Sequence, residues 1–386
     1  MNGSLGQVFL YPKDFQPLDI KTANLPKIEK SLDPPPGLLD DVAFEDSTLT
    51  SEEKKRLITA YILSVMISGS TVGRAILMTL GPTGSGKTFL QRVIGRVLCG
   101  PGFDVTNPDV DAKEFDNKLV NNAYVCLDDV DHVGRDIKAA IRRAVTGGKL
   151  IRRELFTTMK QVEMPYKAAI GLTAIVSPFQ DEEIANRALV FTIKKREEFK
   201  AEDSLLEAID KKRDELMAHF VSRVQRVIAA LNAEQDFIPT VKNRMASFAS
   251  FVLKIAKFEG WEPAAKTMLE HWRQEQEESV FDGGNELAET IERWVTAGED
   301  PFTKEWPKLQ QWLSAGQLYD ELKKHMSGEC YEFKNAMTLA HALQRSAGAF
   351  NRKFGFTFGK PSPNSRKPKR YRFDPTPEQL AALNAE

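Results

Sequence analysis

The stretch GPTGSGKT, residues 81–88, decides the fold of this chain. It fits the pattern Gly-x-x-x-x-Gly-Lys-[Ser/Thr], a glycine-rich loop that holds phosphates when it joins a strand to a helix. The apolar run RAILMTL, residues 74–80, predicts that strand, and FLQRVIGRVL, residues 89–98, has the periodicity of the helix. A chance glycine-rich turn is the alternative, but strand, loop and helix in this order favour a phosphate site.

Each residue type in this loop has a physical reason to be there. Glycines let the backbone curl so that its N–H groups and the helix N-terminus face phosphate oxygens. Lys87 is long enough to reach the β- and γ-phosphates, and the Thr88 hydroxyl is placed to bind Mg²⁺. We therefore expect ATP and Mg²⁺ as cofactors. The expected nucleotide contacts span the loop: Gly81, Pro82, Thr83, Gly84, Ser85, Gly86, Lys87 and Thr88.

A second stretch, YVCLDDVD at residues 124–131, places acidic residues directly after an apolar run. Ligands of open α/β sheets bind beyond the carboxyl ends of the strands, so these acids are expected near the phosphates. Asp128 is the predicted metal ligand, Asp129 the residue that orients the attacking water, and Asp131 a surface residue. Acids after a strand can also form a solvated turn, but their pairing with the glycine-rich loop favours the metal site.

Composition narrows the class of protein further. The chain has 386 residues and 42% hydrophobic content, which is enough to build two or three domains. Its formal net charge is -1. Its cysteines, Cys99, Cys126 and Cys330, are few and widely spaced, which suits a reducing cytoplasm rather than a disulfide framework. The start shows no signal-peptide pattern. The uncharged residues 57–73 contain Ser and Gly, so we expect a buried helix and a loop, not a membrane span.

Changes in pattern along the chain predict its organisation. Residues Thr50 to Glu53 have capping-box spacing and predict a helix start. Apolar runs that alternate with helical patterns predict an α/β core, with a mostly parallel sheet and helices on both faces. A helical lid domain and a small C-terminal domain follow. The expected segments are an N-terminal arm or linker, 1–45; the α/β core, 46–196; the helical domain, 197–305; the C-terminal domain, 306–375; and a tail, 376–386.

Taken together, the motifs resemble those of the AAA+ P-loop ATPases, and especially the helicase-like replication proteins of phages and mobile elements. The resemblance covers about residues 48–375 and is carried in order by GPTGSGKT, LDDVD, TGGKLIRRELFTT, IANRALVFTI, NRMASFASF and a basic C-terminal segment. It implies a P-loop fold and a ring-shaped homo-oligomer, such as a hexamer, with nucleotide between subunits. It also implies a phage or mobile-element origin in a bacterial host.

The resemblance assigns roles to individual residues. Thr173 lies where such proteins keep a polar sensor, often Asn, beside the γ-phosphate. Arg187 lies where an arginine reaches the nucleotide of the neighbouring subunit, and Arg244 where the lid carries a sensor arginine. Asp129 replaces the more usual Glu and is one methylene shorter, which implies weaker activation of water. The alternatives are a surface ion pair for Arg187 and a helix-capping role for Arg244.

Two segments carry candidate contacts to DNA. Residues 146–167 predict a β-hairpin, and the resemblance places such a hairpin in the pore of the ring. Lys149, Arg152 and Arg153 would then contact the nucleic-acid backbone, or instead line the subunit interface near the nucleotide.

The C-terminal segment concentrates positive charge. From Arg345 to Arg372 there are nine Lys or Arg residues and no Asp or Glu, a pattern typical of phosphate-backbone binding. The segment resembles a winged helix, with residues 335–351 as recognition helix and residues 360–369 as wing. A solvated charge run and a protein-binding module are the alternatives. The predicted DNA contacts here are Arg345, Arg352, Lys353, Lys360, Arg366, Lys367, Lys369 and Arg370.

The predicted function is ATP hydrolysis coupled to DNA, as in a replicative helicase or a helicase loader. The alternative is a nucleotide-switched DNA-binding or scaffold protein with slow hydrolysis, which Asp129 and Thr173 favour slightly. A small-molecule kinase ranks below both, because the long helical segment and the basic C-terminal segment have no role in that reaction.

Overall fold

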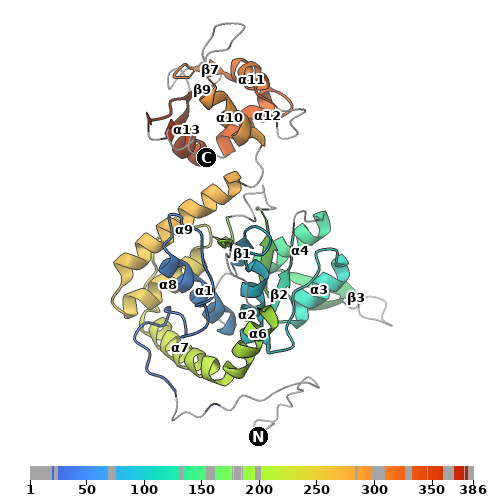
Figure 1. Ribbon diagram of the computed structural model, residues 1–386, viewed down its shortest axis with the longest axis vertical. Coiled ribbons are helices and arrows are strands. Elements are labelled where there is room, and N and C mark those ends of the chain that lie inside the picture. Colours follow the sequence, from blue (N-terminus) through green and yellow to red (C-terminus); the bar gives the residue numbers. More distant parts are fainter. Residues whose placement is uncertain are drawn as a thin grey trace. The chain divides into compact units, whose positions relative to one another are not determined.

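The computed structural model describes most of the chain as two compact units. The first combines Met1–Ile175 with Arg187–Arg273, and the second combines Val176–Asn186 with Gln274–Glu386. Figure 1 shows the elements of both. The residues that the structure describes are 20, 25–67, 75–130, 134–153, 161–175, 177, 184, 186–195, 201–282, 286–297, 309–326, 333–345, 347–359, 369–377, 379 and 380.

A parallel sheet forms the centre of the first unit. Its strands are β1 (Ile76–Leu80), β2 (Tyr124–Leu127), β5 (Ala169–Ala174) and β6 (Ala188–Thr192). Their order is β2-β5-β1-β6, and every neighbouring pair is parallel. All residues of β1, β2 and β5 are buried, as expected for strands covered on both faces. The α/β class and the parallel sheet predicted from the sequence are confirmed.

Helices cover this sheet. Helices α1 (Ser51–Met66) and α2 (Lys87–Cys99) contact each other, and α2 also contacts β1, β2 and β5. Helices α3 (Ala112–Asn121) and α4 (Arg135–Val145) contact each other, and α3 contacts β2. In Figure 1, α3 and α4 lie to the other side of β2 from α1 and α2. The capping box predicted for α1 is confirmed, because Thr50 and Glu53 bond each other's backbone N–H groups.

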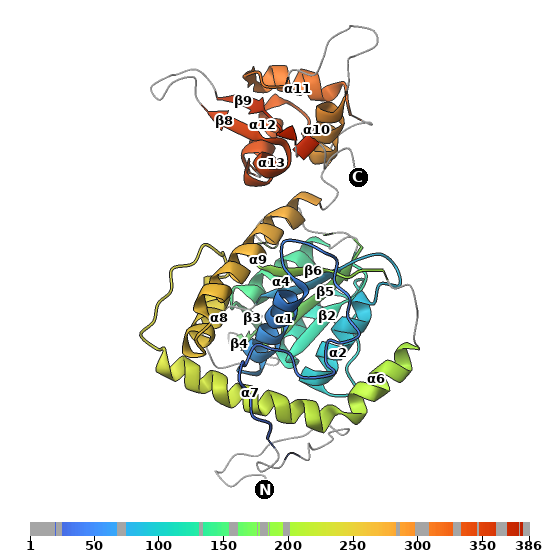
Figure 2. The same ribbon diagram turned by 60° about the vertical axis from the view of Figure 1, so that its left-hand side comes forward.

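The next helices share the hydrophobic core of the sheet. They are α6 (Glu202–Lys211), α7 (Arg213–Ala233), α8 (Ala246–Phe258) and α9 (Glu262–Asp282), and Figure 2 shows α6 and α7 as one long arc beside the sheet. Fully buried Trp272 on α9 donates its indole N–H to the Ala188 carbonyl at the start of β6. The sequence predicts a separate helical domain, whereas the first unit joins residues 201–273 to the sheet in one core.

Part of the N-terminal segment is packed against the same core. Leu32, Leu38 and Leu39 are at most 3% exposed, and Phe44 forms an antiparallel bridge with Ile193 next to β6. Residues 31–45, which the sequence analysis assigned to an N-terminal arm or linker, are therefore packed against the core, and the leucines of this segment anchor it.

Glu259 fixes the start of this packed segment. Its side chain is 0% exposed and accepts hydrogen bonds from Ser31, from Arg226 at 2.8 Å and from the Trp261 indole at 3.1 Å. Glu259→Ala is expected to lower the free energy of unfolding by roughly 2–3 kcal/mol, because it leaves a half-buried cation and two other donors without their acceptor. Chemical denaturation followed by circular dichroism measures this change.

The matched control is Glu262→Ala, three residues further along. Glu262 pairs with Lys266 across one helical turn, and the lysine side chain is 61% exposed. Such a pair contributes about 0.3–0.5 kcal/mol. Equal effects of the two substitutions would contradict a special role for the Glu259 cluster.

The second unit contains a small sheet and four helices among its described residues. They are α10 (Glu286–Thr296), β7 (Leu313–Ser314), α11 (Ala315–Lys323), α12 (Ala336–Arg345), α13 (Ala347–Phe354), β8 (Phe356–Gly359) and β9 (Arg370–Phe373). The sheet is antiparallel in the order β7-β9-β8, which confirms the predicted hairpin of β8 and β9. Trp294 of α10 packs edge-on against Phe373, so α10 belongs to this core although the sequence grouped it with the preceding helices.

Two sequence expectations concern the core and the helices of this unit. The aromatic residues Tyr371 and Phe373 are buried in the core, as predicted. The helix expected over residues 335–351 falls on α12 and α13, and residue 346 between them lies outside the described residues.

Within the described ranges, none of the helices combines the length and the apolar character that crossing a membrane requires.

Candidate nucleotide-binding site

The glycine-rich loop connects β1 to α2 with the backbone that its sequence requires. Gly81, Gly84 and Gly86 all have positive φ, at 145°, 79° and 93°. A Cβ on Gly81 would lie 2.7 Å from the Ile193 carbonyl oxygen and 2.8 Å from the Ser85 hydroxyl, so only glycine fits at this point. The loop therefore has the shape in which backbone N–H groups surround an anion.

Two side chains of the loop are held inside it. Lys87 is only 7% exposed, and its amine lies 3.4 Å from a carboxylate oxygen of Asp129. Ser85 is fully buried, and its hydroxyl has no hydrogen-bond partner among the described residues. A buried hydroxyl without a partner costs free energy, and a phosphate oxygen in the loop would supply the missing bond.

Hydrogen bonds join the two motifs predicted from the sequence. The Thr88 hydroxyl donates to Asp128 Oδ1 at 2.8 Å, and the Thr173 hydroxyl donates to the same oxygen at 2.7 Å. Thr173 also accepts a bond of 2.7 Å from the backbone N–H of Asp129. Because β5 lies beside both β1 and β2, one buried hydroxyl fixes the Asp128 carboxylate and the Asp129 backbone relative to the loop.

The backbone after β2 turns sharply at this point. Asp129 has a φ of 53°, a left-handed conformation that is uncommon outside glycine, and the next residue, Val130, donates its N–H to the Thr173 carbonyl at 2.7 Å. This turn leaves Asp129 exposed beside Lys87 while Asp128 points at Thr88. The two carboxylates therefore contact different residues of the glycine-rich loop.

A buried polar network behind the loop was missed by the sequence interpretation. The Gln91 amide donates to the Leu77 carbonyl at 3.2 Å and to the Thr79 hydroxyl at 3.1 Å, and it accepts a hydrogen bond from Tyr124. Burial raises the pKa of Tyr124 well above its usual value, so its hydroxyl stays a donor. The sequence signal that could have indicated this network is a polar residue within an apolar run, Thr79 before the loop and Gln91 after it. The network fixes α2 on the sheet and with it the loop.

The residues present fit a nucleotide with magnesium. The glycine-rich backbone and the unsatisfied Ser85 hydroxyl would hold phosphate oxygens, together with the Lys87 amine. Thr88 and Asp128 offer adjacent hard oxygen ligands for Mg²⁺, which when bound neutralises phosphate charge.

The two predicted arginines lie outside this cluster. Arg187 directly precedes β6, and Ala188 pairs with Ile76, the first residue of β1. The loop follows the last residue of β1, so Arg187 is about 17 Å away from it along the strand. Arg244 is exposed before α8 and makes no hydrogen bond or ion pair with any residue that the structure describes. Neither residue therefore joins Lys87 within the described part of this chain.

The hairpin predicted over residues 146–167 is confirmed as the antiparallel pair β3 (Lys149–Arg153) and β4 (Gln161–Pro165). Lys149 pairs with Glu163 at 2.7 Å, and Arg152 donates to the Lys113 carbonyl on α3 at 3.3 Å. The side chain of Arg153 lies outside the described residues. Ile151 and Val162 are exposed, at 56% and 41%, so both strands present apolar as well as charged groups to solvent.

The basic residues of the second unit differ in their surroundings. Lys353 lies 3.2 Å from Glu292 of α10, so an internal carboxylate already neutralises part of its charge. Lys369 and Arg370 are exposed, and they bond Gln344 and the Trp312 carbonyl. The other predicted contacts lie outside the described residues or have side chains that are not described: Arg345, Arg352, Lys360, Arg366 and Lys367.

Fold and site together define an α/β protein in which a glycine-rich loop of the phosphate-binding type joins the first strand of a parallel sheet to a helix. More narrowly, the chain belongs to the family of actinomycete integrative conjugative element replication proteins, whose model matches residues 41–267. It is thus a replication protein of a mobile element, as the motifs predicted.

The solved structures that match the chain are distant in sequence. One is described as "SCCmec type IV Cch - active helicase": identity is 11%, the match covers 88% of this chain and 73% of that chain, and the TM-score is 0.42. The apo C-terminal region of NrS-1 (residues 305–718) follows with 14% identity, coverage of 88% and 78%, and a TM-score of 0.37. No curated protein matches the chain significantly.

Proposed function

We propose that this replication protein is an ATP-hydrolysing, AAA+-like protein that acts on DNA in the bacterial host cytoplasm as a replicative helicase or helicase loader. The observation that carries the proposal is the bond network of Thr88, Asp128 and Thr173. In this network the Thr88 hydroxyl and the Asp128 carboxylate lie 2.8 Å apart beside the glycine-rich loop, which supports a role for both as metal ligands.

Each site residue then has a task. Lys87 binds the β- and γ-phosphates, and Thr88 with Asp128 positions the metal. Asp129, exposed and only 3.4 Å from the Lys87 amine, orients the attacking water once phosphate has taken its place beside that amine. Thr173 holds both acids in place. Hydrolysis then depends on positioning and on charge stabilisation rather than on covalent chemistry.

A ring-shaped homo-oligomer, such as a hexamer, accounts for Arg187. This residue lies at the other end of the sheet from its own loop, so it reaches a nucleotide only across a subunit interface. A guanidinium group there would stabilise charge on the transferring phosphoryl group. Arg244, exposed before α8, would approach the nucleotide from the helical segment.

The second unit is the proposed DNA contact. Its element order, with α12 and α13 followed by the β8–β9 hairpin, supports a winged helix, and Lys369 directly precedes β9. Exposed cations at this edge bind phosphates with little dependence on sequence. The β3–β4 hairpin, with Lys149 and Arg152, would add contacts in the pore.

The test is the ATP hydrolysis rate without DNA, with single-stranded DNA and with duplex. We expect DNA to stimulate hydrolysis several-fold at low salt. The double variant Lys369→Gln, Arg370→Gln is expected to keep the DNA-free rate and to weaken DNA binding. The slope of log affinity against log salt should fall by roughly 0.7–0.9 for each phosphate that the double variant no longer binds.

Lys323→Gln on α11 is the matched control, because it removes an exposed charge from another element of the same unit. Full hydrolysis with no response to either form of DNA would count against a DNA-coupled ATPase. An equal decrease of DNA affinity in the control would show a general charge effect.

A nucleotide switch with slow hydrolysis is the second candidate, and the contact between Lys87 and Asp129 favours it. This ion pair must open when phosphate binds Lys87, so nucleotide changes the position of Asp129. ATP-dependent assembly without turnover would follow. Size-exclusion profiles that are identical in ATP and ADP would exclude the switch.

A further inference from the structure

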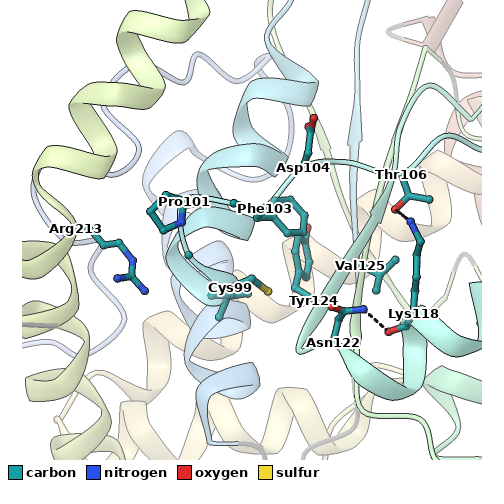
Figure 3. Close-up of a pocket in the computed structure, with 13 residues that line it drawn as sticks. Cys99, Pro101, Phe103, Asp104, Thr106, Lys118, Asn122, Tyr124, Val125 and Arg213 are labelled. Atoms are coloured by element: carbon teal, nitrogen blue, oxygen red, sulfur yellow. Dashed lines mark hydrogen bonds between the residues drawn. The ribbon is translucent and has the colours of Figure 1, made fainter. Parts of the chain in front are cut away.

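A pocket of about 640 Å³ opens in the first unit, at the far end of α2 from the glycine-rich loop. Its walls come from the end of α2, the loop of residues 100–106, α3, β2 and the first residue of α7 (Figure 3). This volume is typical of sites for small molecules. Because α2 runs about 20 Å between the loop and the pocket, the two sites are separate.

The cation Arg213 has no partner in this pocket. It is half-buried and makes no hydrogen bond or ion pair with any described residue, and its Nε atom is buried. Figure 3 shows its side chain entering the pocket from α7 toward Cys99. The nearby carboxylate Asp210 pairs with Arg96 instead, at 2.5 Å. A buried N–H group without an acceptor costs free energy, and an oxyanion beside this guanidinium group would supply the missing acceptor.

The opposite wall is polar and also carries a cation. The Lys118 amine bonds the Thr106 hydroxyl at 3.3 Å and lies 3.6 Å from a carboxylate oxygen of Glu114, one turn earlier on α3. The Asn122 amide donates to the Lys118 carbonyl at 2.9 Å (Figure 3). Asp104 is the acidic residue of the lining, and Arg92 binds it at 2.9 Å. Cys99 is accessible to solvent, but desolvation by the surrounding protein raises the pKa of its thiol, so this side chain adds no negative charge at neutral pH. Lys118 and Asp104 each have a partner of opposite charge, so the charge that favours an anion in this lining is that of Arg213.

Between the two cations the lining is apolar and partly aromatic. Pro101, Phe103 and Val125 form this part, and the Phe103 ring lies 5.5 Å from that of Tyr124. The pocket is larger than a phosphate group needs, so an anion at Arg213 leaves room for an organic body. That body would contact the apolar wall and direct polar groups toward Thr106, Lys118 and Asn122.

We propose that this pocket binds a phosphomonoester the size of a nucleotide, with the phosphate at Arg213 and the organic body toward Lys118 and Asn122. A phosphate monoester carries nearly two charges at neutral pH and matches the fork of a guanidinium group. Arg213 belongs to α7, and residues 98–103 belong to the end of α2 and the loop that follows it, so a bound ligand joins the two segments. The source is either a free nucleoside monophosphate or the 5′-phosphorylated end of a DNA strand.

The test uses the full chain with its glycine-rich loop saturated by a non-hydrolysable ATP analogue. The probes are inorganic phosphate, deoxyadenosine monophosphate, and a short single strand with or without a 5′-phosphate. Binding is measured by calorimetry and by protection of the exposed Cys99 thiol from alkylation, quantified by mass spectrometry. We expect a phosphomonoester probe to bind and to slow alkylation of Cys99, and Arg213→Gln to raise its Kd at least 10-fold.

Lys211→Gln is the matched control, because Lys211 is two residues away, 77% exposed and paired with Glu207. It is expected to bind as the natural chain does, and Arg213→Lys is expected to restore part of the affinity. Binding of the mononucleotide assigns a free ligand, whereas binding of only the 5′-phosphorylated strand assigns a DNA end. The proposal is overturned if no probe binds, if Arg213→Gln binds equally well, or if Cys99 stays unprotected.

Discussion

Lys87→Ala is expected to lower the ATP hydrolysis rate roughly 100-fold or more, the largest effect of any single substitution in this chain. The Lys87 amine is buried in the glycine-rich loop and is the cation that meets the β- and γ-phosphates there. Alanine leaves the backbone cradle but removes this charge. Steady-state phosphate release with saturating Mg²⁺ measures the effect.

Two controls accompany this measurement. Lys113→Ala removes an exposed lysine from α3 and is expected to leave the rate unchanged. The melting temperature of Lys87→Ala should stay close to that of the natural chain, because the ion pair that it removes is with an Asp129 side chain that is 63% exposed. A rate retained within about threefold would mean that hydrolysis does not occur at this loop.

Thr173→Val is expected to lower the hydrolysis rate by roughly 10- to 100-fold, which corresponds to about 1.4–2.7 kcal/mol at the transition state. Valine has nearly the same shape but cannot donate to Asp128 or accept from the Asp129 N–H. Both acids then lack the group that orients them. The rate at saturating ATP and the Mg²⁺ concentration for half-maximal rate measure the change.

Thr173→Ser is the matched control for this position. Serine keeps the hydroxyl and is expected to restore the rate to within about threefold, and the Mg²⁺ requirement should return with it. If serine and valine lower the rate equally, Thr173 acts through packing in β5, and its hydroxyl does not position the metal site.

Much of the nucleotide site could be predicted from local sequence. The features that define this site each depend on a few neighbouring residues. They are the positive φ angles at three glycines, the lysine and threonine at the start of a helix, and the acids after an apolar strand. Such local constraints produce the same short sequence motif in every chain that has a loop of this kind. The distance from Arg187 to its own loop could not be predicted this way, because it depends on which end of β6 lies beside β1.

The sequence by itself determined the parallel α/β core, the phosphate-binding loop, the acidic pair and both hairpins, because short-range periodicity and turn chemistry specify each of them. Only the tertiary structure decided which distant groups meet. The strand order β2-β5-β1-β6 brings Thr173 to Asp128, and a buried carboxylate at Glu259 anchors Ser31 across 228 positions of the chain. Packing of the helices likewise assigned α10 to the second unit and directed Arg213 into its pocket. Contacts of this kind depend on how segments far apart in the sequence pack together and align in the sheet. A local sequence pattern does not contain this information.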